Sequence, residues 1–183
     1  GLMSKIRKEN KVFVTNFGDG ALEQGVLHES LNFASLYKTP VLFLCEDNGL
    51  AVHSPKSERQ SFSIDKLVSS YDIPYYEIQD GHDFMSVQDK SKEVIDFVRE
   101  TQTPAFLKIN TARYKEHVGP GEDFFAGYRS EDEINKWKNQ DPLINDKESY
   151  DEFINQINIE IDEAVQFGID SPLPDMEDLL SDV

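Results

Sequence analysis

The fold is decided by residues 11–20, KVFVTNFGDG, in which an apolar run ends at an acid flanked by two glycines. A helical pattern of apolar residues follows at about 21–37, so this stretch predicts a strand, a tight turn and a helix. A second apolar run, PVLFLC at 40–45, ends at EDNG, residues 46–49. We therefore expect two buried parallel strands, each ending in a turn that carries an acidic or amide side chain.

These two turns predict a site for a metal-bound diphosphate. A crossover helix places the carboxyl ends of parallel strands at one edge of the sheet, so Asp19 and Asn48 are expected to meet there. Carboxylate and amide oxygens suit Mg²⁺, which often completes its shell with phosphate oxygens. Gly18 and Gly20 have no Cβ and let the backbone approach an anion, and a helix opening near Ala21 would direct free N–H groups at it.

The surrounding sequence resembles one enzyme family over residues 18–55, GDGALEQGVLHESLNFASLYKTPVLFLCEDNGLAVHSP. The GDG triplet and the downstream DN resemble the thiamine-diphosphate motif. The whole stretch is similar to the alpha subunit of the decarboxylating component of 2-oxo-acid and acetoin dehydrogenase complexes, in its C-terminal half only. The resemblance implies an α/β fold: a mainly parallel sheet with flanking helices, the thiamine-diphosphate-binding fold, incomplete at its N-terminus.

The resemblance also implies a set of ligands. Thiamine diphosphate would be held through Mg²⁺, whose ligands would be Asp19, Asn48 and the backbone carbonyl of Leu50. The other residues implied to contact the cofactor are Gly18, Gly20, Ala21, Arg113 and His117. Two of these lie in TARYKEHVGP, residues 111–120, which is similar to the family's loop over the diphosphate. His117 is the one residue of the chain to which the resemblance assigns a catalytic role.

Two positions depart from the family pattern. Asp47 stands where an asparagine is usual, and it adds a negative charge beside a diphosphate. Val118 stands where the mitochondrial pyruvate members have a phosphorylatable serine, so control by phosphorylation at that position is excluded. The activating glutamate is implied to come from a beta subunit, which leaves Glu29 and Glu46 without that role.

The remaining histidines and the cysteine have simpler interpretations. His28 and His82 are interpreted as structural, whereas His53 fits a channel-lining or a surface position equally well. Cys45 lies inside the second strand and is interpreted as a small buried apolar residue. A single cysteine excludes an internal disulfide and fits a reducing compartment.

Length and charge suggest two regions. We expect a partial thiamine-diphosphate-binding domain at 1–118 and an acidic helical extension at 119–183 that packs on it. The chain has a formal net charge of −17, and the extension holds 18 acidic and 4 basic residues. Such a surface disfavours nucleic acid. No apolar stretch is long enough to span a bilayer and no signal peptide precedes one, so we expect a cytoplasmic protein without membrane partners.

The implied function is part of a thiamine-diphosphate-dependent oxidoreductase. It would act on a 2-oxo acid or acetoin, pass the acyl group to a lipoyl-bearing acyltransferase, and be inactive alone. Its expected partners are the beta subunit, in a heterotetramer, and the missing N-terminal half of the alpha subunit. Two alternatives stay open. One is an interaction or regulatory module that kept the fold without catalysis. The other is a receiver-like phosphotransfer domain, for which Lys108 is available but the expected pair of aspartates is not.

Overall fold

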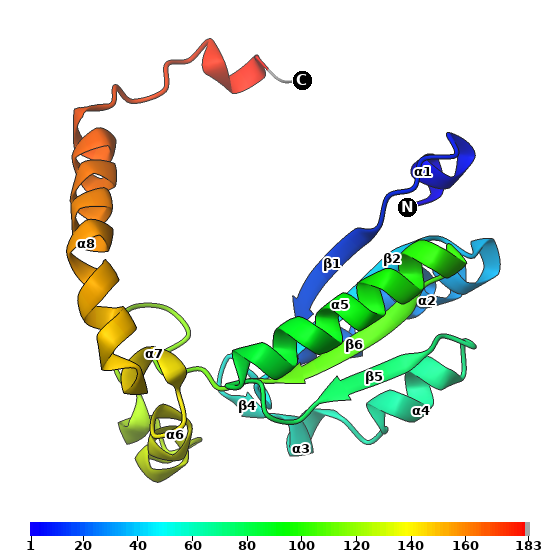
Figure 1. Ribbon diagram of the computed structural model, residues 1–183, viewed down its shortest axis with the longest axis horizontal. Coiled ribbons are helices and arrows are strands. Elements are labelled where there is room, and N and C mark those ends of the chain that lie inside the picture. Colours follow the sequence, from blue (N-terminus) through cyan, green and yellow to red (C-terminus); the bar gives the residue numbers. More distant parts are fainter. Residues whose placement is uncertain (182–183) are drawn as a thin grey trace. The chain divides into compact units, whose positions relative to one another are not determined.

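The computed structural model describes residues 1–181, and these fall into two compact units (Figure 1). The first unit runs from Gly1 to Pro142, and the second begins at Leu143. The first contains all the residues that the sequence predicts for the site.

A four-stranded, fully parallel sheet forms the centre of the first unit. In spatial order its strands are β1 (Phe13–Gly18), β2 (Val41–Asp47), β6 (Ala105–Asn110) and β5 (Tyr75–Ile78). The register pairs Gly18 with Glu46 and Asp47 with Asn110, so the strands end together at one edge. This sheet with its flanking helices confirms the predicted α/β fold.

The two faces of the sheet are covered by different helices (Figure 1). Helices α2 (Gly25–Tyr37) and α4 (Ile64–Ser69) contribute to a core that includes Phe43 and Phe106. Helix α5 (Phe84–Thr101) contributes to a second core, which includes Leu42 and Leu107. Neighbouring residues on one strand thus belong to opposite cores, because side chains alternate across a pleated strand. The face of the sheet that carries Phe43 and Phe106 becomes polar towards the carboxyl ends of the strands. There Asp47 follows Phe43 on β2, and Lys108 follows Phe106 on β6, on the same face.

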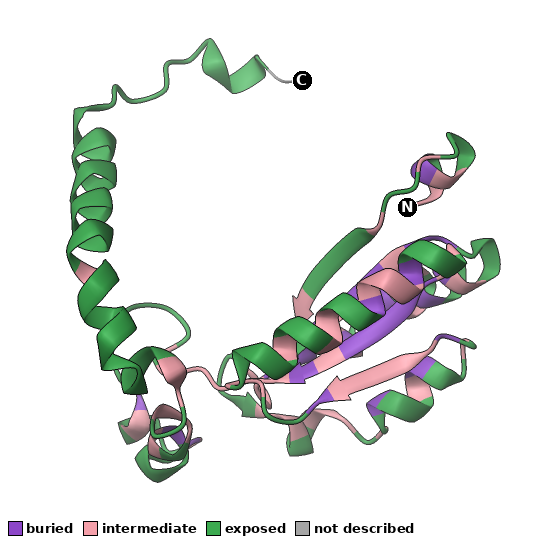
Figure 2. Ribbon diagram, in the orientation of Figure 1, coloured by how far each residue is buried: buried purple, intermediate pink, exposed green. Residues whose placement is uncertain are grey.

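The edge strand β1 is not buried, and that expectation was wrong. Phe13 is 40% exposed and Val14 is 52% exposed, although they point to opposite faces of the sheet. Figure 2 shows β1 mostly exposed beside the buried central strands. Parallel strands are normally covered on both faces, and only the β2 side of β1 is paired here.

The turn after β1 is tighter than predicted. Residues Asp19–Glu23 form a 3₁₀ helix, η1, and Gln24 is extended, so α2 begins at Gly25. The expected α-helix start near Ala21 was therefore wrong. Gln24 is extended, with φ −82° and ψ 135°, and this ends the 3₁₀ helix. The α-helix therefore begins at Gly25, four residues after the predicted position.

A small arm between β2 and α4 was not predicted. It consists of a two-stranded antiparallel hairpin, β3 (Leu50–Ala51) and β4 (Ser54–Pro55), followed by the one-turn helix α3 (Lys56–Arg59). Elements this short leave no hydrophobic period in the sequence. The polar side chains of this arm reach back to the ends of β1 and β2, where Arg59 contacts Asp19 and Lys56 contacts Asp47.

The remaining elements of the chain are short except for one long helix. They are α1 (Leu2–Ile6), η2 (Phe124–Ala126), α6 (Glu131–Lys138), α7 (Pro142–Asn145), α8 (Lys147–Asp170) and η3 (Asp178–Leu180). A capping box begins α6: Ser130 N donates to the Glu133 carboxylate, and Glu133 N donates to the Ser130 hydroxyl.

Helix α8 dominates the second unit. It continues through Gly168 to Asp170. The boundary predicted at residue 118 and the packing of the extension on the first unit stay predictions. Among the described residues, no helix combines the length and apolarity needed to cross a bilayer.

Phe106 on β6 links the first core across the sheet. Its ring centroid is 5.9 Å from that of Phe17 on β1 and 6.0 Å from that of Tyr75 on β5. The Phe43 ring on β2 stacks on it at 6.4 Å, and Phe106 itself is 0% exposed. One side chain therefore contacts aromatic rings from all three other strands.

We predict that Phe106→Ala destabilises the first unit by about 3–5 kcal/mol, because it removes this contact and leaves a cavity. Urea denaturation monitored by circular dichroism measures the change. Phe125→Ala is the matched control: Phe125 is 90% exposed, so its loss should change the unfolding free energy by less than about 0.5 kcal/mol. Equal effects of the two substitutions would contradict the assignment of the core.

Candidate functional site

The carboxylate of Asp19 is buried at the end of β1 and only half satisfied. The residue is 1% exposed, and its Oδ2 accepts a hydrogen bond of 2.6 Å from Arg59 Nη2. Its Oδ1 has no hydrogen-bond partner in the structure and is inaccessible. Buried polar atoms are nearly always paired, and an unpaired charged oxygen is costly. The Asp19 side chain therefore fits a cation ligand.

The arm after β2 closes over this turn. Arg59 pairs with Glu23 as well as Asp19, and its Nε donates to Ser54 O at 3.0 Å. Gln60 Nε2 donates to the backbone oxygen of Asp19 at 3.0 Å and to Glu23 Oε1 at 2.6 Å. Sequence reasoning missed these partners because they lie about 40 positions away in an element without a period.

Gly20 lies where the arm meets the turn. A Cβ on Gly20 would stand 3.0 Å from Ala51 Cβ, which is closer than side chains usually pack. The glycine therefore permits β3 to approach the turn, an effect distinct from the predicted approach of an anion. The backbone of Gly18 remains exposed at the strand end.

The turn after β2 is held by its own side chains. Leu50 N donates to Asn48 Oδ1 at 2.9 Å, and Gly49 N donates to Asp47 Oδ1 at 3.0 Å. Gly49 has φ +75°, a conformation that glycine adopts without strain. Both side chains thus form local turns, and Asn48 Oδ1 keeps a second lone pair for a further partner.

Asp47 is the centre of a chain of charges. It forms an ion pair with Lys56 on α3, and Lys108 Nζ lies 3.5 Å from its Oδ2. Lys108 also pairs with Glu77 at 2.6 Å. Burial would raise the pKa of Asp47, but the hydrogen bond and charge of Lys56, the Gly49 amide and Lys108 outweigh it and lower that pKa. The acid that departs from the family pattern is therefore locally neutralised.

A cavity of about 310 Å³ opens beside the second turn. The predicted site residues that line it are Asn48, Leu50 and Arg113. Asp19 does not line it, since its carboxylate is engaged by Arg59 instead. The lining also includes residues for which the sequence predicts no role, among them Tyr128, Arg129, Glu133 and Trp137.

Arg113 anchors the loop after β6. Its Nη2 donates to Val52 O at 3.1 Å and to the Tyr128 hydroxyl at 2.7 Å. Its Nη1 lies 3.4 Å from His117 Nδ1, so the two predicted residues of this loop are brought together. The loop and the β3–β4 hairpin are therefore connected through one guanidinium.

A buried ion pair supports that anchor. Asp123 Oδ1 accepts from Arg129 Nε at 2.8 Å, and both residues are at most 9% exposed. Asp123 also accepts from the Tyr128 hydroxyl, and Arg129 donates to the backbone oxygen of Arg113. Burial would raise the pKa of Asp123, but Tyr128, Arg129 and Arg113 lower it overall.

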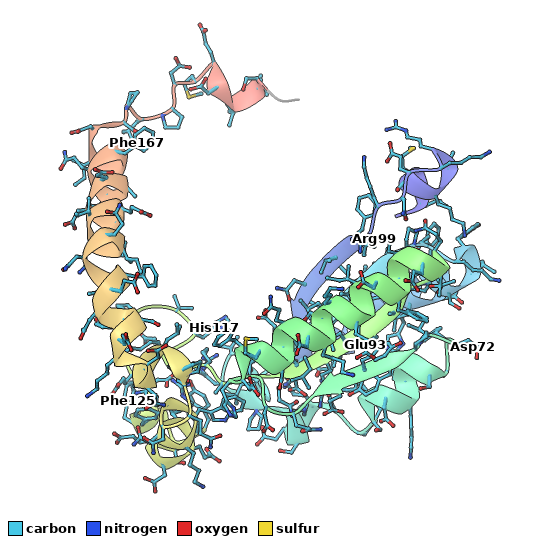
Figure 3. The ribbon with its side chains drawn as sticks, in the orientation of Figure 1. Asp72, Glu93, Arg99, His117, Phe125 and Phe167 are labelled. Carbon is cyan, nitrogen blue, oxygen red and sulfur yellow. The ribbon has the colours of Figure 1, made fainter. Side chains whose placement is uncertain are left out.

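His117 itself is exposed. Figure 3 shows it in the loop beyond the carboxyl end of the sheet, whereas Arg99 lies towards the other end of α5. His117 is not among the residues that line the cavity. The other histidines contact aromatic rings: His28 with Tyr71, His53 with Tyr128 and His82 with Trp137.

Cys45 takes no part in this chemistry. The residue is fully buried on β2, and burial together with the carboxylates of Asp47 and Asp19 raises its pKa to about 12. The thiol therefore stays protonated at neutral pH and packs as a small apolar side chain. This agrees with its interpretation from the sequence.

The geometry defines a class of site: two turns at the carboxyl edge of a parallel sheet, where open α/β folds bind phosphorylated ligands. One turn presents a buried acid with an unpaired oxygen, and the next presents an amide oxygen and backbone carbonyls. Residues 1–181 contain no cluster of three His, Cys, Asp or Glu side chains placed for a metal ion. The predicted ligand set contains one such side chain, Asp19.

The chain belongs to the dehydrogenase E1 component family, whose model matches residues 1–177. It is 32% identical over 192 residues to the pyruvate dehydrogenase E1 component subunit alpha of Rickettsia typhi, covering 98% of this chain and 57% of that protein. It is 33% identical over 141 residues to the subunit of that name from Staphylococcus aureus, covering 76% and 38%. The predicted resemblance to the alpha subunit is confirmed. The matched region spans 57% of the length of the Rickettsia typhi subunit and 38% of that of the Staphylococcus aureus subunit.

The solved structures include a similar fold. Transketolase from Campylobacter jejuni aligns with a TM-score of 0.50 and 15% identity, over 56% of this chain and 16% of that one. At this identity the likeness shows the fold alone, and it agrees with the predicted thiamine-diphosphate-binding fold.

We predict that Asp47→Asn destabilises the chain by about 1–3 kcal/mol at pH 7, because it weakens charged hydrogen bonds within the Lys56–Asp47–Lys108 cluster. The folded-state pKa of Asp47 is lowered, so its stabilisation is present above the unfolded pKa and is lost as pH falls through the folded value. The difference between wild type and variant should therefore shrink below about pH 4.

Urea denaturation between pH 3 and 7 tests this dependence. Asp96→Asn is the matched control, because Asp96 pairs with Lys92 and Arg99 on the exposed face of α5. Its effect should be small over the whole range, because water screens exposed ion pairs. A constant difference between wild type and Asp47→Asn over the whole range would contradict the role of the charge.

Proposed function

We propose that the chain forms the diphosphate- and Mg²⁺-binding part of a thiamine-diphosphate-dependent dehydrogenase alpha subunit. The observation that carries this proposal is the buried Asp19 carboxylate, which has one oxygen without a partner at the end of β1. The Asn48 turn stands at the end of the adjacent strand in the same register. The family to which the chain belongs uses thiamine diphosphate and Mg²⁺.

The ligand set that we propose is small. Asp19 Oδ1, Asn48 Oδ1 and the Leu50 carbonyl would hold the metal, since all three are hard oxygen donors. The cofactor contacts that we propose are the backbone of Gly18, Gly20 and Ala21 together with the side chains of Arg113 and His117. Arg113 would supply charge-assisted hydrogen bonds to phosphate oxygens.

When bound, thiamine diphosphate supplies the electron sink for cleavage of a bond next to a carbonyl. The chain's own residues hold and orient the diphosphate end. The ion pairs around Asp47 fix the turn that presents Asn48, and the Asp123–Arg129 pair supports Arg113. His117 is the side chain that we propose to hold or move a proton, because it is exposed beside Arg113.

Substrate and partners are part of the proposal. The alpha subunits that the chain matches are named for pyruvate dehydrogenase, which favours a 2-oxo acid over acetoin. We propose a beta subunit and a lipoyl-bearing acyltransferase as partners, and a cytoplasmic location stays a prediction.

The unpaired edge of β1 supports a further partner. Its apolar residues are exposed on both faces, and an apolar hollow of about 500 Å³ between α2 and the sheet includes Thr15, Phe33 and Phe43 in its lining. Exposed parallel edges bind further strands. We propose that the other part of an alpha subunit adds a strand here, since the relatives are longer than this chain.

A receiver-like phosphotransfer domain has less support. Such a site needs a free lysine near the acid, and Lys108 is committed to Glu77 and Asp47. Phosphorylation of Asp19 by a small phosphodonor would favour that function. A regulatory module without catalysis is the other alternative, and it predicts no cofactor binding.

We predict saturable, Mg²⁺-dependent binding of thiamine diphosphate, measured by isothermal titration with the beta subunit and the rest of the alpha subunit supplied. Asp19→Ala and Asn48→Ala should each weaken binding by more than about tenfold, because each removes a metal ligand. Asp96→Asn is the control and should bind normally. Absence of binding in the complete mixture would favour the regulatory module.

We also predict that Val14→Lys blocks association with the remaining part of an alpha subunit, because it places a charge on the exposed face of β1. Pull-down with that part measures the loss, expected to exceed about tenfold in affinity. Met85→Lys is the matched control, as Met85 is similarly exposed, at 52%, but lies on α5 and not on β1. Equal association of both variants would refute the role of β1.

A further inference from the structure

We propose that Arg59 is an internal counter-cation for the metal-binding carboxylate. It neutralises one oxygen of Asp19, allows the turn to fold without a metal, and weakens the binding of a divalent cation by its own charge. This inference rests on the proposed function, since it concerns the same acid, but it assigns a role to a residue outside the motif and the ligand set.

The contacts place Arg59 inside the site. Its side chain is 11% exposed, and Nη2 lies 2.6 Å from Asp19 Oδ2. The guanidinium also pairs with Glu23, whose side chain is 24% exposed. One positive charge therefore serves two acids. The cluster retains a negative charge and one free oxygen, Asp19 Oδ1.

The guanidinium is fixed on three sides. Nη1 is bound to Glu23, Nη2 to Asp19 and Nε to Ser54 O. Breaking the bond to Asp19 would leave two other contacts in place. The positive charge consequently stays beside Asp19 when a cation occupies Oδ1.

Two electrostatic effects then oppose each other. Without Arg59, the Asp19 carboxylate would be a buried charge with no counter-ion, which is strongly destabilising. With Arg59 present, a divalent cation at Oδ1 lies close to the positive guanidinium that is bound to Oδ2 of the same carboxylate. The repulsion between these two cations is large where water is excluded. Arg59 thus stabilises the turn when no metal is bound and lowers the affinity of Asp19 for a divalent cation.

The burial of Arg59 separates this role from a surface ion pair. Exposed pairs contribute little because water screens them. Here both partners are shielded, and among the described residues the Asp19 carboxylate has no hydrogen-bond partner besides Arg59. Loss of the charge at position 59 should therefore raise the affinity for the metal and lower the stability of the metal-free chain. An arginine that only held the arm against the turn would not raise the metal affinity when it is replaced.

The test compares thermal melting and direct Mn²⁺ titration by electron paramagnetic resonance, using the chain as it stands. Arg59→Gln should melt at a lower temperature in EDTA and recover in excess Mg²⁺. It should bind Mn²⁺ about tenfold more tightly than wild type, because the like charge is gone. Arg99→Gln, an exposed arginine paired with Asp96, is the control and should change neither quantity.

Several outcomes overturn the inference. Lower melting that Mg²⁺ does not restore, or Mn²⁺ affinity equal to or weaker than that of wild type, would make Arg59 a structural latch only. Absence of Mn²⁺ binding by both proteins would overturn it as well. Should Arg59→Gln fail to fold in either buffer, Arg59→Lys decides: because lysine keeps the positive charge, this variant should bind Mn²⁺ with about the affinity of wild type, and clearly tighter binding refutes the proposal.

Asp19→Asn separates this inference from the proposed function. If the cation binds at Asp19, this variant should lose Mn²⁺ binding whatever Arg59 does. Loss of binding in Asp19→Asn without a gain in Arg59→Gln overturns only the role of Arg59. Mn²⁺ binding retained in Asp19→Asn removes both the proposed metal site and this inference.

Discussion

A negative charge buried at the end of a strand is the constraint on which the site depends. Asp19 is shielded from water, so a positive group has to accompany it. The chain supplies that group from α3, which begins 37 residues further along. The hairpin and α3 must therefore fold back over the first turn. The position of the arm, and with it the shape of the site, follows from this electrostatic requirement.

Other buried acids at the carboxyl edge of the sheet are also paired with basic residues from another segment. Asp47 is accompanied by Lys56 from the arm and Lys108 from β6, and Asp123 is accompanied by Arg129 from the following loop. Each acid fixes one segment against another, because removing one partner of a buried pair is costly. Three loops that carry no regular core are thus held by charge rather than by apolar burial. The acid at position 47 is compatible with the site because its charge is balanced locally.

The sequence allowed the sheet to be predicted well, because apolar runs and crossover helices leave strong periods. Strand β1 ends at the predicted turn, and β2 continues two residues beyond its apolar run to Asp47. The acids were also identified, since strand-end turns mark them. Their partners were not: Arg59 ends a one-turn helix and Gln60 follows it, and nothing local indicates that a lysine such as Lys56 pairs with an acid. The tight 3₁₀ turn was missed because tertiary contacts, not propensity, decide where α2 begins. The exposure of β1 could not be read from its residues, which are those of an interior strand.

The unpaired edge of β1 affects how the chain aggregates. An uncovered, apolar, parallel strand is a template on which copies of the chain can stack and precipitate. The same polypeptide carries a net charge of −17, concentrated after residue 118. Mutual repulsion between such molecules opposes their approach at low ionic strength and fades as salt screens it. We therefore expect the negative charge after residue 118 to oppose aggregation of the chain at low ionic strength. Added salt should weaken this repulsion and favour association through β1.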